Sequence, residues 1–154
     1  MAFPYKKILC PVDFDDTSPE AVKEAAALAV HGGSTLVLMH VVQINPLAAQ
    51  GAAQGYAGGQ LYEGQLELAR KQVAQMVADL PAGLKHEIVV EIGEPGDSIV
   101  AAEQSLGADL VVMATHGRRG LTRIVLGSVA ERVVRGSSVP VLTVRPGPGG
   151  GSNQ

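Results

Sequence analysis

Residues 113–128 contain glycines at a fixed spacing, which follow an apolar run and precede a sequence pattern typical of a helix N-terminus. Gly117 and Gly127 are separated by nine residues, and Ser128 follows directly. Glycine allows a backbone to approach a ligand closely, and a helix N-terminus offers unpaired N–H groups at the positive end of the helix dipole. Ser128 and Glu131 form the Ser-x-x-Glu pattern of a capping box, which predicts that a helix begins beside Gly127. The spacing therefore predicts an anion site, with phosphate as its natural occupant.

The apolar run before these glycines predicts a buried parallel strand. Residues 108–114 are continuous and rich in β-branched side chains, rather than alternating between apolar and polar. The chain thus runs from a strand through a glycine loop into a helix. The two commonest phosphate-binding patterns are absent from the sequence: it contains neither Gly-x-Gly-x-x-Gly nor the Gly-Lys-Ser or Gly-Lys-Thr of a P-loop.

The rest of the chain alternates strand and helix patterns. Strands are predicted at residues 5–12, 35–42, 86–92 and 139–144, and helices at 18–31, 62–80 and 97–106 and from Ser128. Alternation of this kind predicts an α/β fold, with a parallel sheet covered by helices on both faces. We expect one domain over residues 1–145. We also expect residues 43–60 to form a mobile loop, either a lid or a plain surface crossover, and residues 146–154 to form a disordered tail.

Composition restricts the class of function. The net charge is −3, and the chain has two Phe, three Tyr and no Trp. The sequence therefore has neither the positive field nor the aromatic stacking surface that would favour binding to nucleic acid. No run approaches the roughly 20 apolar residues of a membrane span, and residues 1–11 lack the core of a signal peptide, so we expect a cytoplasmic protein without membrane contact. The single Cys10 lies in an apolar strand and is expected to be an inert buried thiol.

Several stretches, in their order along the chain, resemble the universal stress protein family. They are residues 8–13, 38–42, 93–95, 107–113, 127–133 and 139–142. The glycine spacing resembles the Gly-x2-Gly-x9-Gly-Ser pattern of family members that bind nucleotides, with Ala114 in place of the first glycine. The resemblance implies an open five-stranded parallel sheet in the order 3-2-1-4-5, a Rossmann-like fold similar to the adenine nucleotide alpha hydrolases. Ligands of such sheets bind at the carboxyl ends of the strands where the strand order reverses, here strands one and four.

The resemblance also implies the position of an adenine nucleotide. It implies an adenine surrounded by Pro11, Val12, Asp13 and the backbone of Val41. It implies a ribose and phosphates near Met113, Ala114 and Gly117, and phosphates received by Gly127, Ser128 and Val129. ATP is the expected ligand, with AMP or ADP as alternatives, and Mg²⁺ is expected on the phosphates. Taken from its residue type alone, Asp13 either accepts a hydrogen bond from the nucleotide or compensates a helix dipole.

No residue pattern indicates catalysis. His116 and Arg118 suggest a base and a phosphate clamp, but no second feature supports them, and His40 fits a structural histidine on an apolar strand. Four scattered histidines lack metal-site spacing. We therefore expect an ATP-binding sensor or regulator of stress responses rather than a fast enzyme. Two alternatives remain: a slow ATPase or nucleotidyl- or phosphotransferase, and an interaction module without nucleotide.

The last predicted strand, from Val139 to Val144, leaves an apolar sheet edge that needs a partner. The resemblance implies a homodimer formed by pairing this strand across a twofold axis, and the edge argument makes such pairing reasonable. Shielding of the edge by the tail is the alternative. The regulated partner protein cannot be named from the sequence.

Overall fold

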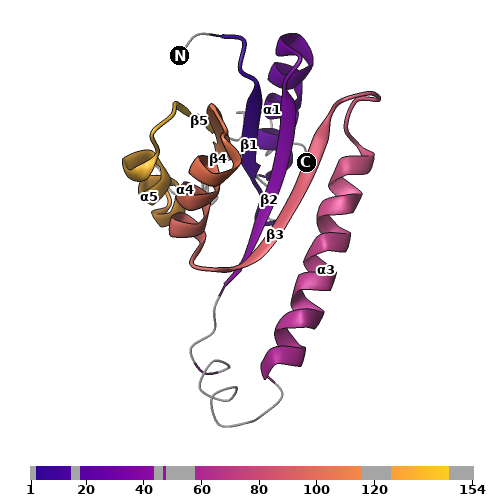
Figure 1. Ribbon diagram of the computed structural model, residues 1–154, viewed down its shortest axis with the longest axis vertical. Helices are drawn as coiled ribbons and strands as arrows, with labels where there is room; N and C mark the ends of the chain where they lie inside the picture. The colour runs from indigo at the N-terminus through magenta and orange to yellow at the C-terminus, as the bar shows by residue number, and fades with distance from the viewer. Residues whose placement is uncertain (1–2, 15–17, 44–46, 48–57, 116–125, 146–154) are drawn as a thin grey trace, which may run out of the picture.

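The computed structural model describes residues 3–14, 18–43, 47, 58–115 and 126–145. Five parallel strands form one sheet in the order β3-β2-β1-β4-β5, which confirms the predicted fold (Figure 1). The elements are β1 (Lys7–Pro11), α1 (Ser18–Gly32), β2 (Thr35–Gln43), α3 (Gly58–Ala78), β3 (His86–Gly93), α4 (Pro95–Leu106), β4 (Leu110–Ala114), α5 (Ser128–Gly136) and β5 (Val141–Val144).

Alternate residues of each central strand supply two separate cores, one on each face of the sheet. In β1, Ile8 and Cys10 face the core shared with α1 and α3, whereas Leu9 faces the core shared with α4 and α5. Figure 1 shows α1 behind the sheet and α4 with α5 in front of it, while α3 runs alongside β3. Burial on both faces explains why these strands read as continuous apolar runs rather than as alternating patterns.

Small residues bring α1 close to the sheet. Ala21, Ala25 and Ala29 are fully buried along one stripe of this helix, and Val22 and Ala26 are nearly so. Gly33 has a φ of 67°, a left-handed conformation that ends the helix and that glycine adopts without strain. The helix predicted at residues 18–31 is confirmed, and it extends to Gly32.

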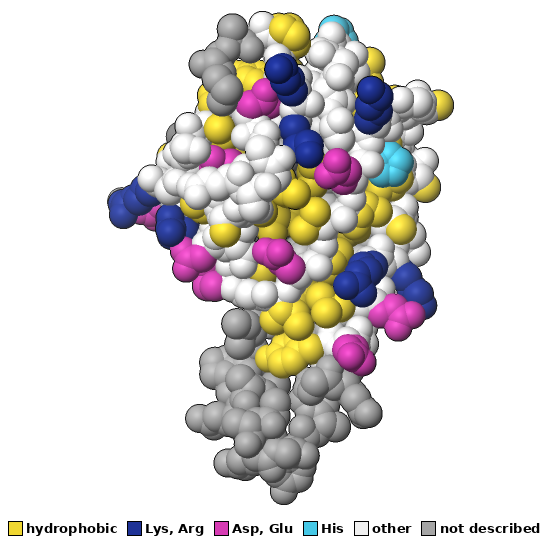
Figure 2. All heavy atoms as spheres, in the orientation of Figure 1, with side chains coloured by type: hydrophobic (Ala, Val, Ile, Leu, Met, Phe, Trp, Pro, Cys, Tyr) yellow, Lys and Arg dark blue, Asp and Glu magenta, His cyan; other side chains and the backbone are white. Residues whose placement is uncertain are grey.

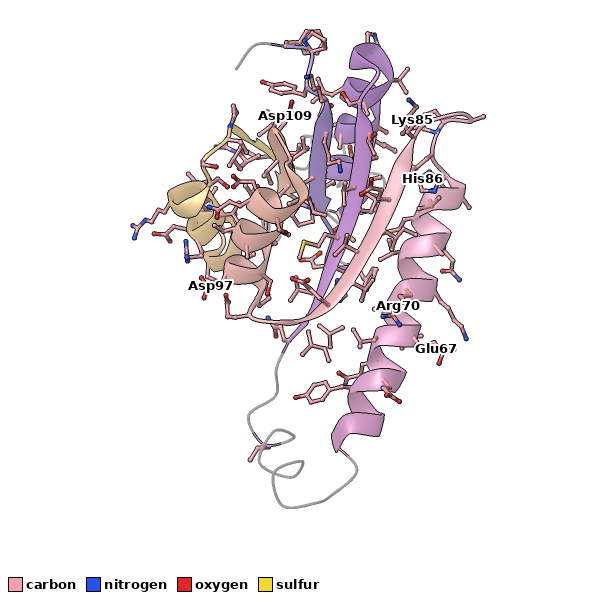
Figure 3. The ribbon with its side chains drawn as sticks, in the orientation of Figure 1. Glu67, Arg70, Lys85, His86, Asp97 and Asp109 are labelled. Atoms are coloured by element: carbon pink, nitrogen blue, oxygen red, sulfur yellow. The ribbon has the colours of Figure 1, made fainter. Side chains whose placement is uncertain are left out.

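A carboxylate fixes β1 beside β4 at the amino end of the sheet. The Asp109 side chain accepts hydrogen bonds from the backbone N–H groups of Lys6 (2.8 Å) and Lys7 (2.9 Å), and the Asp109 N–H donates to the Lys7 carbonyl (2.9 Å). Figure 3 shows Asp109 at the opposite edge of the sheet from Asp97, which lies near the start of α4. These bonds set the register of the two strands whose carboxyl ends flank the point where the strand order reverses.

Several predicted boundaries need correction. The capping box is wrong: α5 begins at Ser128 with Gly127 as its N-cap, and no side chain caps it. Ser128 therefore already lies in the first turn, and Glu131 pairs with Arg135 (2.8 Å) instead. Helix α4 begins at Pro95 rather than Asp97, because the Glu94 side chain accepts from the Asp97 N–H (2.9 Å).

The last strand is shorter than predicted. β5 begins at Val141 rather than Val139, although the Pro140 carbonyl still accepts from the Val111 N–H (3.0 Å). The strand forms one edge of the sheet, as the sequence indicated. The loop predicted at 43–60 ends earlier than expected, because α3 begins at Gly58. The other residues of this loop, apart from 43 and 47, lie outside the described part of the chain, as does the tail.

Candidate adenine-nucleotide site

A cavity of about 560 Å³ opens at the carboxyl edge of the sheet, where β1 and β4 lie side by side. Its volume falls within the usual range for small-molecule sites. It is lined by Pro11, Val12, Asp13, Phe14, Ser18, Met39, His40, Val41, Val42, Gln43, Gln65, Leu68, Ala69, Gln72, Pro95, Ile99, Met113, Ala114, Val129 and Ala130. On the face drawn in Figure 2, hydrophobic side chains run down the middle of the molecule toward this edge.

Seven of the ten predicted site residues line this cavity: Pro11, Val12, Asp13, Val41, Met113, Ala114 and Val129. They come from four separate segments of the chain, and the strand order brings them together. Gly127 and Ser128 stand at the start of α5, next to the lining residue Val129. Gly117 and the basic residues predicted near it lie outside the described residues.

The turn after β1 is held by a hydroxyl. Ser18, the first residue of α1, is almost fully buried; its Oγ donates to Asp13 Oδ1 (2.7 Å) and accepts from the Asp13 N–H (3.1 Å). The Asp13 carboxylate is thereby fixed at the cavity wall, close to the N-terminus of α1. Both readings of Asp13 fit this position, because the carboxylate is exposed to the cavity and also lies beside a helix dipole.

The β1–β2 ladder stops at the cavity, which leaves a backbone edge without a partner. The Val12 N–H donates to the Met39 carbonyl (2.8 Å), so this edge of β2 faces β1. Two residues later Val41 presents its N–H and its carbonyl to the same side, since backbone groups alternate along a strand. β1 has ended there, and among the described residues neither group of Val41 has a hydrogen-bond partner. Val41 is 92% buried and lines the cavity.

The start of α5 offers further unpaired donors. The first intrahelical bond of this helix runs from the Glu131 N–H to the Gly127 carbonyl (2.8 Å). The N–H groups of Ser128, Val129 and Ala130 precede it and therefore have no acceptor within the helix. Val129 and Ala130 line the cavity, so the positive end of the α5 dipole is directed at it.

Ala114 does not strain the site. It is the last residue of β4, and in β4–β5 pairing it lies opposite Val144. Phe14 is the single non-glycine residue with a positive φ in the described part of the chain, so Ala114 has an ordinary backbone conformation there. The glycine of the family pattern is therefore not required at this position for its conformational freedom.

Part of the cavity wall was not predicted from the sequence. Gln65, Leu68, Ala69 and Gln72 lie on one side of α3, at the i, i+3, i+4 and i+7 spacing of a single helical face. That spacing is visible in the sequence, but it also fits a core-facing stripe. His40 and Phe14 also line the cavity, which the sequence did not indicate. The expectation of a structural histidine agrees with the position of His40, whose Nδ1 lies 2.7 Å from the Val12 carbonyl oxygen.

The described residues contain no group of three His, Cys, Asp or Glu side chains that is arranged to hold a metal ion. The Cys10 thiol lies fully buried in β1, and burial raises its pKa from 9.0 to about 12. A thiol with this pKa is inert at neutral pH, as the sequence indicated.

Comparison with known proteins identifies the family. Residues 4–145 match the sequence profile of the universal stress protein family. The universal stress protein MJ0531 of Methanocaldococcus jannaschii is 38% identical over 144 residues, which cover 92% of this chain and 82% of that protein. The chain belongs to the universal stress protein family. This assignment confirms the resemblance seen in the sequence.

Solved structures of universal stress proteins share the fold. That of MJ0577, also from M. jannaschii, is 30% identical with a TM-score of 0.79, covering 93% of this chain and 97% of that one. Another, a universal stress protein in complex with cAMP, is 26% identical with a TM-score of 0.60. The match covers 91% of this chain and 96% of that one. Among the described residues of the present protein, no helix is long and apolar enough to cross a membrane.

Proposed function

We propose that this universal stress protein binds an adenine nucleotide, ATP foremost, in the cavity at the carboxyl edge of its sheet. The observation that carries the proposal is the unpaired backbone of Val41 inside a mostly apolar cavity. The solved relative in complex with cAMP adds support, because cAMP carries the same base. AMP and ADP are the alternative ligands.

The base is assigned to the part of the cavity between β1, β2 and β4. The adenine edge carries an amino donor at N6 and an acceptor at N1, which match the carbonyl and the N–H of Val41. Apolar side chains of Met39, Val41 and Met113 flank this edge and would cover the faces of the ring. Asp13, held by Ser18, is placed to accept from a ribose hydroxyl.

The phosphates are assigned to the N-terminus of α5. The free N–H groups of Ser128, Val129 and Ala130 supply donors, and Gly127 has no side chain to obstruct an approaching oxygen. Gly117, from the family pattern, is assigned to the same part of the site. Mg²⁺ would enter with the phosphates, since oxygen ligands from a triphosphate suit it.

Binding without fast chemistry suits a sensor or regulator in the stress response. In the described part of the cavity, His40 already donates its Nδ1 proton to the Val12 carbonyl, and Asp13 is engaged by Ser18. The β5 edge, where Leu142 is 38% exposed, is the surface assigned to homodimer formation through the strand predicted from Val139 to Val144. A nucleotide-dependent change at this edge would communicate ligand state to a partner.

Calorimetric titration of the purified protein with ATP and Mg²⁺ tests the proposal. Gly127→Val adds a branched side chain where phosphate must approach, so it should weaken binding by at least about tenfold. Gly64→Val is the matched control, because a Cβ at Gly64 on α3 meets nothing within 4 Å. Circular dichroism establishes that both variants fold. Absence of binding to the wild type at millimolar ATP, or equal loss in both variants, would refute the proposal.

A further inference from the structure

Where the β1–β2 ladder ends, a side chain takes the place of the next backbone donor. In a regular parallel ladder, the bond after Val12 N–H to Met39 carbonyl runs from the Val41 N–H to the Val12 carbonyl. The described residues contain no such bond. Instead the Val12 carbonyl accepts from His40 Nδ1 at 2.7 Å. His40 therefore occupies the acceptor that the Val41 N–H would otherwise use.

The imidazole is held in this role from two directions. A carbonyl oxygen can only accept, so Nδ1 carries the proton. The Phe14 ring packs against the imidazole, with ring centroids 4.2 Å apart and planes inclined by 33°. Phe14 has a φ of 66°, a left-handed conformation that is strained for a non-glycine residue. A strained residue lining a cavity is often placed there by function, and here it supports the histidine ring.

We infer that His40 makes the nucleotide site selective for adenine by keeping the Val41 backbone edge open. This inference rests on the proposed function. By occupying the Val12 carbonyl, His40 prevents the ladder from closing by one further bond. The Val41 N–H and carbonyl then remain available to a base that offers an acceptor at N1 and a donor at N6. Hypoxanthine and guanine present the reverse pattern, an N1–H donor and an O6 acceptor. They would place donor against donor at the Val41 N–H and acceptor against acceptor at its carbonyl.

His40 is a positioning residue in this scheme, because it acts through the backbone of its neighbours. A histidine that only stabilised the fold would affect all nucleotides alike. Positioning predicts instead a change in the preference between ATP and inosine triphosphate (ITP), which differ at N1 and position 6 of the base. The buried donor and acceptor of Val41 would be left mispaired by ITP, which is costly in a buried site.

Three variants separate the alternatives. His40→Leu removes the donor to Val12 and allows the Val41 N–H to close onto that carbonyl. His40→Asn keeps a donor in the position of Nδ1, since both nitrogens are two bonds from Cβ. His86→Leu is the matched control: this histidine also has its Nδ1 near a backbone carbonyl, that of Leu84 (3.2 Å), but it is exposed and does not line the cavity. Figure 3 shows His86 near the start of β3, far from the carboxyl edge.

Titrations with ATP and ITP measure the preference. The wild type, His40→Asn and His86→Leu should prefer ATP by at least about tenfold, whereas in His40→Leu the two affinities should agree within about threefold. An unchanged preference in His40→Leu would overturn the inference alone. Failure of the wild type to bind either nucleotide would overturn the proposed function and the inference with it.

Hydrogen exchange of the ligand-free protein tests the open edge without any nucleotide. The Val41 amide should exchange at least about tenfold faster than the Met39 amide, which lies within the β1–β2 ladder. The Val41 amide should become protected in His40→Leu and, in the wild type, after addition of ATP. Equal protection of the two amides in the ligand-free wild type would overturn the inference, whether or not ATP binds.

Discussion

The buried thiol of Cys10 should make folding stability depend on alkaline pH, and Cys10→Ala should remove that dependence. Cys10 has no solvent exposure, and burial raises its pKa from 9.0 to about 12. The unfolded chain exposes the thiol to water, where its pKa returns to the ordinary value. Thiolate formation above pH 9 therefore favours the unfolded state.

The size of the effect follows from these two pKa values. Below pH 9 the thiol is neutral in both states, so its contribution to stability is fully present. Between pH 9 and about 12 that contribution is lost, because only the unfolded thiol ionises. At pH 10 the unfolded thiol is about ten parts thiolate to one part thiol. The unfolding equilibrium constant then rises about tenfold, which corresponds to a little over 1 kcal/mol.

Urea denaturation under reducing conditions measures this difference. The wild type and Cys10→Ala are each unfolded at pH 7.5 and at pH 10, and the change in unfolding free energy between the two pH values is compared. Other groups that titrate in this range cancel, since both proteins share them. The wild type should lose about 1 kcal/mol more than the variant. Equal losses would show that Cys10 is not buried in β1 and would refute the core assignment.

Three further predictions concern single side chains at the two ends of the sheet. Ser18→Ala removes the hydroxyl that holds Asp13, so it should lower stability by about 1–2 kcal/mol in urea denaturation and weaken ATP binding several-fold; an unchanged affinity would contradict the assigned role of Asp13. Asp109→Asn leaves one of two acceptors for the backbone N–H groups at the start of β1, so a loss of about 1–3 kcal/mol is expected, and a loss below about 0.5 kcal/mol would count against the clamp. Ala114→Gly should change ATP affinity by less than about threefold in calorimetry, since Ala114 needs no positive φ; a tenfold gain would show that its Cβ obstructs the ligand.

The order of elements and the fold could be predicted from sequence, because the strands that supply both cores appear as continuous apolar runs. The α1 stripe was equally clear, since small residues recur at helical spacing and Gly33 ends the helix. Boundaries were less predictable. The Ser-x-x-Glu pattern fits a capping box, yet α5 begins at Ser128, and Glu131 pairs with Arg135 instead. The N-cap of α4, Glu94, was not predicted, because the helical spacing of apolar residues does not extend to that position.

The site was predictable only in part, because its chemistry lies in backbone geometry as well as in side chains. The stretches near Pro11 and Met113 were indicated by resemblance, and topology brings them together. No residue pattern shows that the Val41 backbone loses its partner, since this depends on the residue at which β1 ends. The aromatic contact between Phe14 and His40 was also invisible, because it depends on a left-handed backbone conformation at Phe14.

NMR mapping of the ¹⁵N-labelled protein during titration with ATP and Mg²⁺ is the most direct test of nucleotide binding in this cavity. Nucleotide binding in this cavity should give saturable shifts of the Val41, Val129 and Ala130 amides, from the two ends of the proposed site. The amides of Lys6 and Asp109, at the opposite edge of the sheet, should stay unchanged. Absence of shifts at Val41 and Val129 at millimolar ATP, or shifts confined to the opposite edge, would contradict the claim that this cavity binds an adenine nucleotide.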